Sequence, residues 1–239
     1  MNLVLLPDDR PERCLPPGDT RAEHIRGVLK MSVGDTFDVG VINGPRGKAI
    51  IVEDDHTAGM RLRMEWTAPP DKPFPIALLI GLPRPQTARK ILQETTSMGV
   101  SLIIFFDSDK GESSYRQSRL WATAEWKRHL TLGAEQAFTT WLPEVFHFPS
   151  LHDALGCPSA NTGRYALDVY EAAAPLSSMP TEHAAFNLAV GSERGWSPSE
   201  RTTLRENGYQ LVDLGERILR TETACTVAIA IIAAQMGWM

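Results

Sequence analysis

The stretch IALLIGLPRPQTARKILQETTSMGVSLIIFF, residues 76–106, decides the fold class. It opens and closes on continuous apolar runs, and the segment between them is amphipathic and ends at Gly99. Apolar runs of this length are typical of strands buried on both faces, and the middle segment has the period of a helix. The stretch therefore predicts a strand, a crossover helix and a second strand parallel to the first.

The same alternation continues to the C-terminus. Further strands are predicted at YALDVY, FNLAVG and YQLVDLG, and helices at 117–137, at 198–207 and in the apolar terminal segment from about Cys225 to Ala234. Strands alternating with helices indicate an α/β domain whose parallel sheet is covered on both faces.

A different pattern precedes this domain. TFDVGVI, KAIIVE and MRLRMEW alternate as short strands between turn signals, with one helix predicted over residues 21–31. We expect a small β-barrel at 1–68. The prolines of WTAPPDKPFPI predict a stiff linker at 69–75, which places the α/β domain at 76–239.

Composition narrows the class of protein. The chain has 239 residues, of which 43% are hydrophobic and 22% charged, so it can bury an ordinary core. The net charge of −5 argues against coating nucleic acid by bulk electrostatics and leaves a local basic face possible. Three widely spaced cysteines suggest neither a disulfide framework nor a zinc site, and we expect no metal, no membrane segment and a cytoplasmic location.

Two loops carry most of the candidate chemistry, because ligands of such sheets bind at the carboxyl ends of strands. GSERGWSPSE (191–200) follows one strand and predicts a capping box from Ser197 to Glu200. LGERILRTETA (214–224) follows the next, where Thr221 or Thr223 could cap the last helix. A cap does not explain Arg217 and Arg220, since a cation at a helix N-terminus meets an unfavourable dipole. These arginines indicate an anionic or electron-rich partner.

The two loops together resemble the paired signature of the RsmE family, 16S ribosomal RNA uracil-N3 methyltransferases of the SPOUT superfamily. HIRGVLKMSVGD (24–35), ARKILQETTSMGV (88–100) and GAEQAFTTWLPEV (133–145) are similar to further family motifs, in the same order along the chain. The chain departs from the usual pattern at Ser192, Arg194, Thr139 and Lys30, where the family commonly has Pro, Gly, Arg and Arg.

The resemblance implies a PUA-like barrel that helps to hold RNA, followed by a SPOUT-type α/β domain with a C-terminal trefoil knot. It further implies S-adenosylmethionine as the cofactor, a homodimer, and 16S rRNA or the small ribosomal subunit as the partner. The expected reaction is methylation at N3 of a specific uridine.

The motifs also imply site residues. Cofactor contacts are expected from Asp168, Val190, Gly191, Glu193, Gly195, Leu214, Gly215, Ile218, Leu219, Arg220 and Thr221. For catalysis, Arg220 is expected to stabilise the charge that spreads onto the uracil oxygens, and Glu222 or Glu193 to accept the proton. RNA contacts are expected from Arg26, Lys30, Arg84, Arg89, Lys90 and Arg116.

Several alternatives stay open. Asp168 could cap a turn, Glu222 could cap the last helix, Trp196 could be a core residue rather than part of the cofactor site, and each basic residue could be a solvated surface charge. A SPOUT enzyme with a different target nucleotide or a catalytically silent RNA-binding paralogue would share these motifs. A third alternative is an enzyme that uses another nucleotide cofactor. The sequence disfavours it, because the chain lacks the phosphate-binding glycines that such a cofactor needs.

Overall fold

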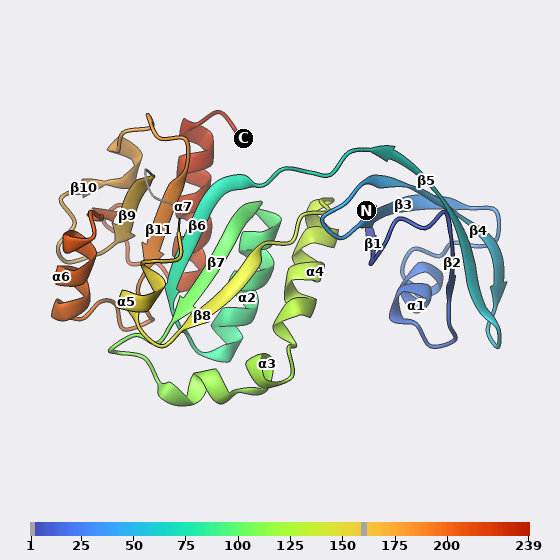
Figure 1. Ribbon diagram of the computed structural model, residues 1–239, viewed down its shortest axis with the longest axis horizontal. Coiled ribbons are helices and arrows are strands. Elements are labelled where there is room, and N and C mark those ends of the chain that lie inside the picture. Colours follow the sequence, from blue (N-terminus) through green and yellow to red (C-terminus); the bar gives the residue numbers. More distant parts are fainter. Residues whose placement is uncertain (1–2, 159–161) are drawn as a thin grey trace. The chain divides into compact units, whose positions relative to one another are not determined.

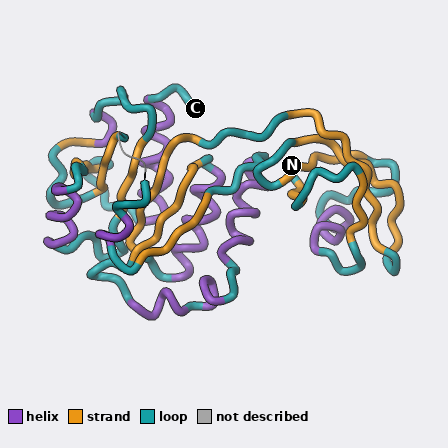
Figure 2. Tube along the Cα trace, in the orientation of Figure 1, coloured by secondary structure: helices purple, strands orange, loops and turns teal. Residues whose placement is uncertain are grey.

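The computed structural model describes residues 3–158 and 162–239, which form two compact units (Figures 1 and 2). The first comprises the described residues up to Lys72 together with Ala134–Leu142, and the second comprises Pro73–Gly133 and Pro143–Met239. Residues 134–142 thus join the N-terminal unit, although they lie within the range expected for the second domain. The boundaries 1–68, 69–75 and 76–239 stay a prediction.

The first unit is a five-stranded sheet with the order β1-β3-β4-β5-β2. Its strands are β1 (Val4–Leu6), β2 (Glu12–Leu15), β3 (Thr36–Val41), β4 (Arg46–Asp55) and β5 (Gly59–Ala68). Helix α1 (Thr20–Gly27) buries Ala22 and Ile25 in the core of this sheet. The expected extension of α1 to Met31 is wrong, because Lys30 adopts a left-handed conformation with φ of 55° that a helix cannot contain.

The segment that returns to the first unit explains one departure from the family pattern. The hydroxyl of Thr139 and the backbone N–H of Thr140 both donate to Asp71, at 3.0 and 2.9 Å. Asp71 also pairs with Arg46 at 3.2 Å. Thr139 therefore has a structural partner within the first unit.

The second unit is a seven-stranded sheet with the order β10-β12-β9-β11-β6-β7-β8, and every pair in it is parallel. Its strands are β6 (Phe74–Gly81), β7 (Val100–Phe106), β8 (Glu144–Phe148), β9 (Gly163–Leu167), β10 (Ala174–Pro175), β11 (Phe186–Val190) and β12 (Gln210–Asp213). The predicted α/β class with a preceding small β domain is confirmed. The trefoil knot stays a prediction.

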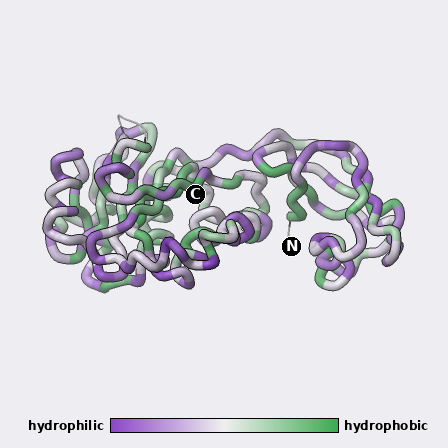
Figure 3. Tube along the Cα trace, turned by 60° about the horizontal axis from the view of Figure 1, so that its bottom comes forward, coloured by the Kyte–Doolittle hydropathy of each residue, from purple (hydrophilic) through white to green (hydrophobic). Residues whose placement is uncertain are grey.

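The helices of this unit are α2 (Pro85–Ser97), α3 (Arg119–Ala122), α5 (Leu151–Ala154), α6 (Pro198–Glu206) and α7 (Thr221–Gln235), with 3-10 turns η1 (Ser113–Gln117) and η2 (Leu176–Ser178). Helix α4 (Trp126–Ala137) begins in this unit, and its last residues, from Ala134, belong to the first. Helices α5 and α6 cover one face of the sheet, and α2 packs beside α7 on the other (Figure 1). Hydrophobic segments gather inside the unit (Figure 3). Both faces are covered, as predicted.

Two details differ from the sequence-based expectation. The single helix predicted over 117–137 is wrong, because the chain breaks between α3 and α4 at Ala124, whose φ is 56°. Strand β6 begins at Phe74 and contains Pro75. The strand tolerates this proline because the register with β7 shifts between Phe74 and Ala77, at the start of the ladder.

Candidate active site

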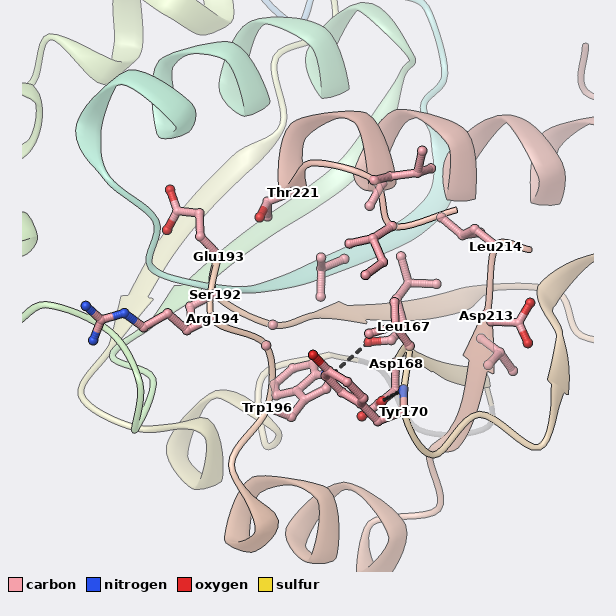
Figure 4. Close-up of a pocket in the computed structure, with 18 of the residues that line it drawn as sticks. Leu167, Asp168, Tyr170, Ser192, Glu193, Arg194, Trp196, Asp213, Leu214 and Thr221 are labelled. Atoms are coloured by element: carbon pink, nitrogen blue, oxygen red, sulfur yellow. Dashed lines mark hydrogen bonds between the residues drawn. The ribbon is translucent and has the colours of Figure 1, made fainter. Parts of the chain in front are cut away.

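A pocket of about 290 Å³ lies where the loops after β9, β11 and β12 meet the first turn of α7 (Figure 4). We call it the motif pocket, because both sequence motifs line it. Its walls comprise Leu167, Asp168, Val169, Tyr170, Val190, Gly191, Ser192, Glu193, Arg194, Gly195, Trp196, Arg201, Val212, Asp213, Leu214, Gly215, Arg217, Ile218, Leu219, Thr221 and Ala224. Parallel strands that end at one edge of the sheet bring together loops from distant parts of the sequence. The pocket therefore lies where it was predicted, at the carboxyl ends of the strands.

The loop after β11 is closely packed. The N–H of Gly195 donates to the carbonyl of Ser192 at 2.8 Å, and Gly195 has a φ of 68°, which suits glycine. A Cβ on Gly81 would lie only 2.7 Å from the backbone nitrogen of Ser192. Glycine at the end of β6 therefore lets this loop pass close to the sheet.

The predicted capping box at the start of α6 is confirmed. Ser197 and Glu200 exchange hydrogen bonds, at 2.8 Å from the Ser197 N–H to the carboxylate and 3.0 Å from the Glu200 N–H to the hydroxyl. Asp109, which follows β7, accepts hydrogen bonds from the hydroxyls of Ser197 and Ser199. These bonds fix the loop after β11 to the loop after β7.

Trp196 forms a fixed part of the pocket wall. It is 1% exposed, its indole N–H donates to the carbonyl of Leu167 at 2.8 Å, and its ring stacks on Phe106. In Figure 4 this bond joins the loop after β11 to the end of β9. Trp196 thus belongs both to the core and to the pocket.

Asp168 forms a buried ion pair in the same wall. The Nε of Arg201 donates to it, and the side chains are 9% and 1% exposed for Arg201 and Asp168. The backbone N–H groups of Tyr170 and Glu171 also donate to Asp168. Burial alone would raise the pKa of Asp168, but these donors outweigh it and hold the pKa below its usual value. The carboxylate therefore caps a turn and lines the pocket at once.

The loop after β12 supplies the opposite wall. Gly215 has a φ of 100°, and its N–H donates to Asp213 at 2.8 Å. Ile218 lines the pocket although it is 77% exposed, and Arg217 lines it as well. An exposed aliphatic side chain at a pocket mouth is suited to cover a flat apolar ligand.

Arg220 lies between two lining residues, Leu219 and Thr221, but is itself exposed and outside the pocket wall. The expected capping of the last helix by Thr221 or Thr223 is wrong, since Arg220 is the N-cap and makes no side-chain capping bond. The first turn of α7 thus begins at the pocket without a side-chain cap.

Glu222 is 7% exposed and accepts a hydrogen bond from Lys90 of α2 at 3.2 Å. Burial opposes its ionisation, but its own backbone N–H, Lys90 and the charge of Arg220 together lower the pKa of Glu222. Glu222 does not line the pocket among the described residues.

The expected RNA-contact residues are dispersed. Arg26 pairs with Asp54 in the first unit, where Lys30 is exposed. In the second unit Arg89 pairs with Glu125, Lys90 with Glu222 and Arg116 with Asp107. The backbone N–H of Arg84 donates to Glu193 at 3.2 Å. Arg84 is thus the one of these six whose backbone bonds to a wall residue of the motif pocket.

Sequence reasoning missed Arg201 and Ala224, which both line the pocket from helices. A signal for Arg201 exists, because it lies three residues before buried Leu204 and so shares the core face of α6. Over the described residues no cluster of His, Cys, Asp or Glu could hold a metal ion. In the same residues, no helix has the length and apolarity that a membrane crossing needs.

The α/β unit matches a known class of RNA-modifying domain. Residues 70–233 match the family described as RNA methyltransferase domain, so the α/β unit is an RNA methyltransferase domain.

The particular family follows from the relatives. Over 224 residues the chain is 36% identical to the ribosomal RNA small subunit methyltransferase E of Treponema pallidum, covering 90% of this chain and 83% of that protein. It is 28% identical over 235 residues to ribosomal RNA small subunit methyltransferase E 1 of Borreliella burgdorferi, covering 98% of both. The chain belongs to the ribosomal RNA small subunit methyltransferase E family, as its motifs predicted.

The fold agrees with solved structures. The enzyme of the same name from Neisseria gonorrhoeae, bound to S-adenosyl methionine, superposes with a TM-score of 0.81 at 23% identity, and 98% of each chain is covered. A putative methyltransferase from Legionella pneumophila, also in complex with that cofactor, gives a TM-score of 0.84 at 18% identity over 98% of this chain and 97% of the other.

Proposed function

We propose that this protein transfers a methyl group from S-adenosylmethionine to N3 of a uridine in 16S rRNA of the small ribosomal subunit. The observation that carries the proposal is the motif pocket, in which Gly191–Gly195 and Leu214–Leu219 face each other across one cavity. Membership of the methyltransferase E family supports the small subunit as the substrate.

The pocket suits this cofactor. Its volume of about 290 Å³ is near the lower end of the range of ligand pockets, roughly 300 to 1,000 Å³. Leu167, Ile218 and Leu219 give apolar walls for an adenine ring, whose edges backbone groups of the two loops would bind. The uncapped N-terminus of α7 would hold the carboxylate of the methionine part. When bound, S-adenosylmethionine supplies a methyl group activated by a sulfonium.

The chain must supply alignment and charge stabilisation. Uracil N3 becomes a good nucleophile only when its proton leaves, and the resulting negative charge spreads onto the carbonyl oxygens. Arg220 is the proposed stabiliser, because its permanently charged guanidinium is solvent-exposed beside the pocket and can give two donors to a carbonyl edge.

For proton transfer we favour Glu193 over Glu222. A pKa below the ordinary value makes Glu222 a weaker base, and among the described residues it does not line the motif pocket. Glu193 lines the pocket with its side chain one-third exposed. Glu222 is then a positioning residue that ties the start of α7 to α2.

Three further proposals accompany this one. Lys30 and Arg84 are proposed RNA contacts, because Lys30 is exposed and Arg84 is only loosely paired, with its Nε 3.7 Å from Glu193. Arg26, Arg89, Lys90 and Arg116 have nearer carboxylate partners within the chain. We also propose that the C-terminal part is knotted and that the protein acts in the cytoplasm. Cys14, Cys157 and Cys225 are all free thiols, which suits a reducing compartment.

The test is methyl transfer from labelled S-adenosylmethionine to small subunits that lack the modification, followed by mapping of the labelled nucleotide. We expect one label per subunit, at N3 of a uridine in 16S rRNA. Label on another nucleotide would show that the proposed target is wrong and that the protein is still a methyltransferase. Binding of subunits without any transfer would mean a catalytically silent RNA-binding protein.

A homodimer is proposed from helix α7. Glu222 is its only charged residue, and Val227 and Ile231 remain half-buried while Ala234 is exposed. These three positions share one face because they are four and three residues apart. A helix that is apolar all round is normally buried, so a second copy of the chain is the proposed cover of this face.

The double substitution Val227→Glu, Ile231→Glu is expected to convert a dimer into a monomer in analytical ultracentrifugation, because two carboxylates would lose water in the interface. Thr202→Glu, at an exposed position of α6 and away from this face, is the matched control and should leave the dimer intact. A wild-type protein that sediments as a monomer at micromolar concentration would exclude the dimer.

A further inference from the structure

A second pocket of about 290 Å³ adjoins the motif pocket, and we call it the basic pocket. The residues that matter in its lining are Arg84, Lys110, Glu112, Tyr115, Glu193 and Arg194. Both pockets share Ser192, Glu193 and Arg194, so one loop separates them. In Figure 4 the side chain of Arg194 extends away from the pocket residues around Leu167 and Trp196. A ligand in the basic pocket would thus lie next to the proposed methyl donor.

The cations of the basic pocket are held only loosely by the protein. Arg194 Nη2 lies 3.5 Å from Glu112 Oε1, with the side chains 70% and 52% exposed. Arg84 Nε lies 3.7 Å from Glu193, and Lys110 Nζ lies 3.5 Å from the carbonyl of Arg194. Exposed pairs of this kind contribute about 0 to 1 kcal/mol. These cations can therefore turn to an anionic ligand at little cost.

The charge of this pocket favours an anion. Three cationic side chains, Arg84, Lys110 and Arg194, stand against the two carboxylates of Glu112 and Glu193. The surplus is positive although the whole chain carries −5. A local surplus of positive charge on an acidic protein attracts an anionic group such as a phosphate.

Tyr115 adds a flat apolar surface to the same pocket. It lies in η1, is half-buried and lines the same pocket as Arg84, Lys110 and Arg194. Aromatic rings next to basic side chains are the arrangement that binds single-stranded RNA, since the ring stacks a base and the cations meet its phosphate.

We propose that the basic pocket holds the nucleotide adjacent to the methylated one on the same RNA strand, with its phosphate at Lys110 and Arg194 and its base against Tyr115. This inference rests on the proposed function, because it assigns the basic pocket to the same RNA substrate. It gives Arg194, which stands where the family commonly has glycine, a role in positioning RNA. It also gives Glu112 a role, since that carboxylate competes with the phosphate for Arg194.

The test compares the affinity of four variants for small subunits and their Michaelis constants for subunits and for S-adenosylmethionine. Lys110→Ala and Tyr115→Leu should weaken RNA binding several-fold and leave cofactor affinity unchanged. For Lys110→Ala the slope of log affinity against log salt should also fall by roughly 0.7 to 1. Glu112→Gln should act in the opposite direction and tighten RNA binding, because it frees Arg194. Lys127→Ala, an exposed lysine on α4, is the matched control.

The outcomes separate the two proposals. If the wild type methylates subunits but Lys110→Ala and Tyr115→Leu match Lys127→Ala in RNA affinity, the role of the basic pocket is overturned and the methyltransferase stands. Weaker RNA binding by Glu112→Gln would also overturn it. If the wild type neither binds nor methylates subunits, the proposed function is wrong, and the role of the basic pocket in RNA binding is wrong with it. Thermal unfolding of each variant verifies that a lost affinity does not reflect a lost fold.

Discussion

Replacing Arg220 by alanine is expected to lower turnover by about 10²- to 10³-fold, the usual effect of removing one charged donor from a developing oxyanion. Affinity for S-adenosylmethionine should stay within a few-fold of wild type, because Arg220 is exposed and outside the wall of the motif pocket. Single-turnover methyl transfer at saturating cofactor, together with calorimetric titration of the cofactor, measures both quantities.

Arg220→Lys is the informative partner variant. Lysine keeps the charge but cannot give two parallel donors, so it should recover only part of the lost rate. A large loss of cofactor affinity in Arg220→Ala would instead assign this residue to the cofactor site. Unchanged turnover in both variants would remove Arg220 from the mechanism.

Asp168→Asn is expected to lower the free energy of unfolding by about 3 kcal/mol, because it leaves the buried charge of Arg201 without its main partner. The loss should fall at the lower end of the usual range of 3 to 5 kcal/mol, since Glu171 remains 3.5 Å from Arg201. Urea unfolding measures it. Asp168→Asn combined with Arg201→Met removes the orphaned charge and should recover part of the stability. If the double variant is no more stable than the single one, the ion pair is not the cause.

The same pair predicts a pH dependence. The pKa of Asp168 is lowered in the folded state, so its contribution is present above the unfolded value of about 3.9 and is lost as pH falls through the lower folded value. The stability difference between wild type and Asp168→Asn should therefore be constant near neutrality and shrink below about pH 4. A difference that grows towards acid pH would contradict the assignment.

The second unit was predictable where local signals agree with the fold. Strand β7, VSLIIFF, is apolar except at Ser101 and was predicted at its observed bounds, and α6 begins at a proline after a capping serine. The break between α3 and α4 was not predictable, because neither Gly nor Pro marks it, and alanine rarely takes the left-handed conformation that Ala124 has. Edge strand β8 was missed because its residues are only partly buried and lack a continuous apolar pattern.

The candidate site, too, was predictable where local sequence motifs mark it and not where it depends on tertiary packing. Ten of the eleven expected cofactor residues line the motif pocket, with Arg220 as the exception, whereas Ala224 of the second motif was missed. Their assignment as cofactor contacts stays a prediction. The pairing of Lys90 with Glu222 could not be predicted, because it depends on the packing of α2 beside α7. The basic pocket was missed for a similar reason, since its residues come from three separate loops.

The central claim is that the motif pocket holds the methyl donor, and calorimetric titration of S-adenosylmethionine tests it most directly. Ala224 lines the pocket from the first turn of α7, so Ala224→Phe would fill the cavity. Its neighbour Thr223 is exposed and outside the lining, which makes Thr223→Phe the matched control. We predict that wild type and Thr223→Phe bind one cofactor per chain with similar affinity and that Ala224→Phe binds none. Equal binding by all three proteins, or no binding by the wild type, would contradict the claim.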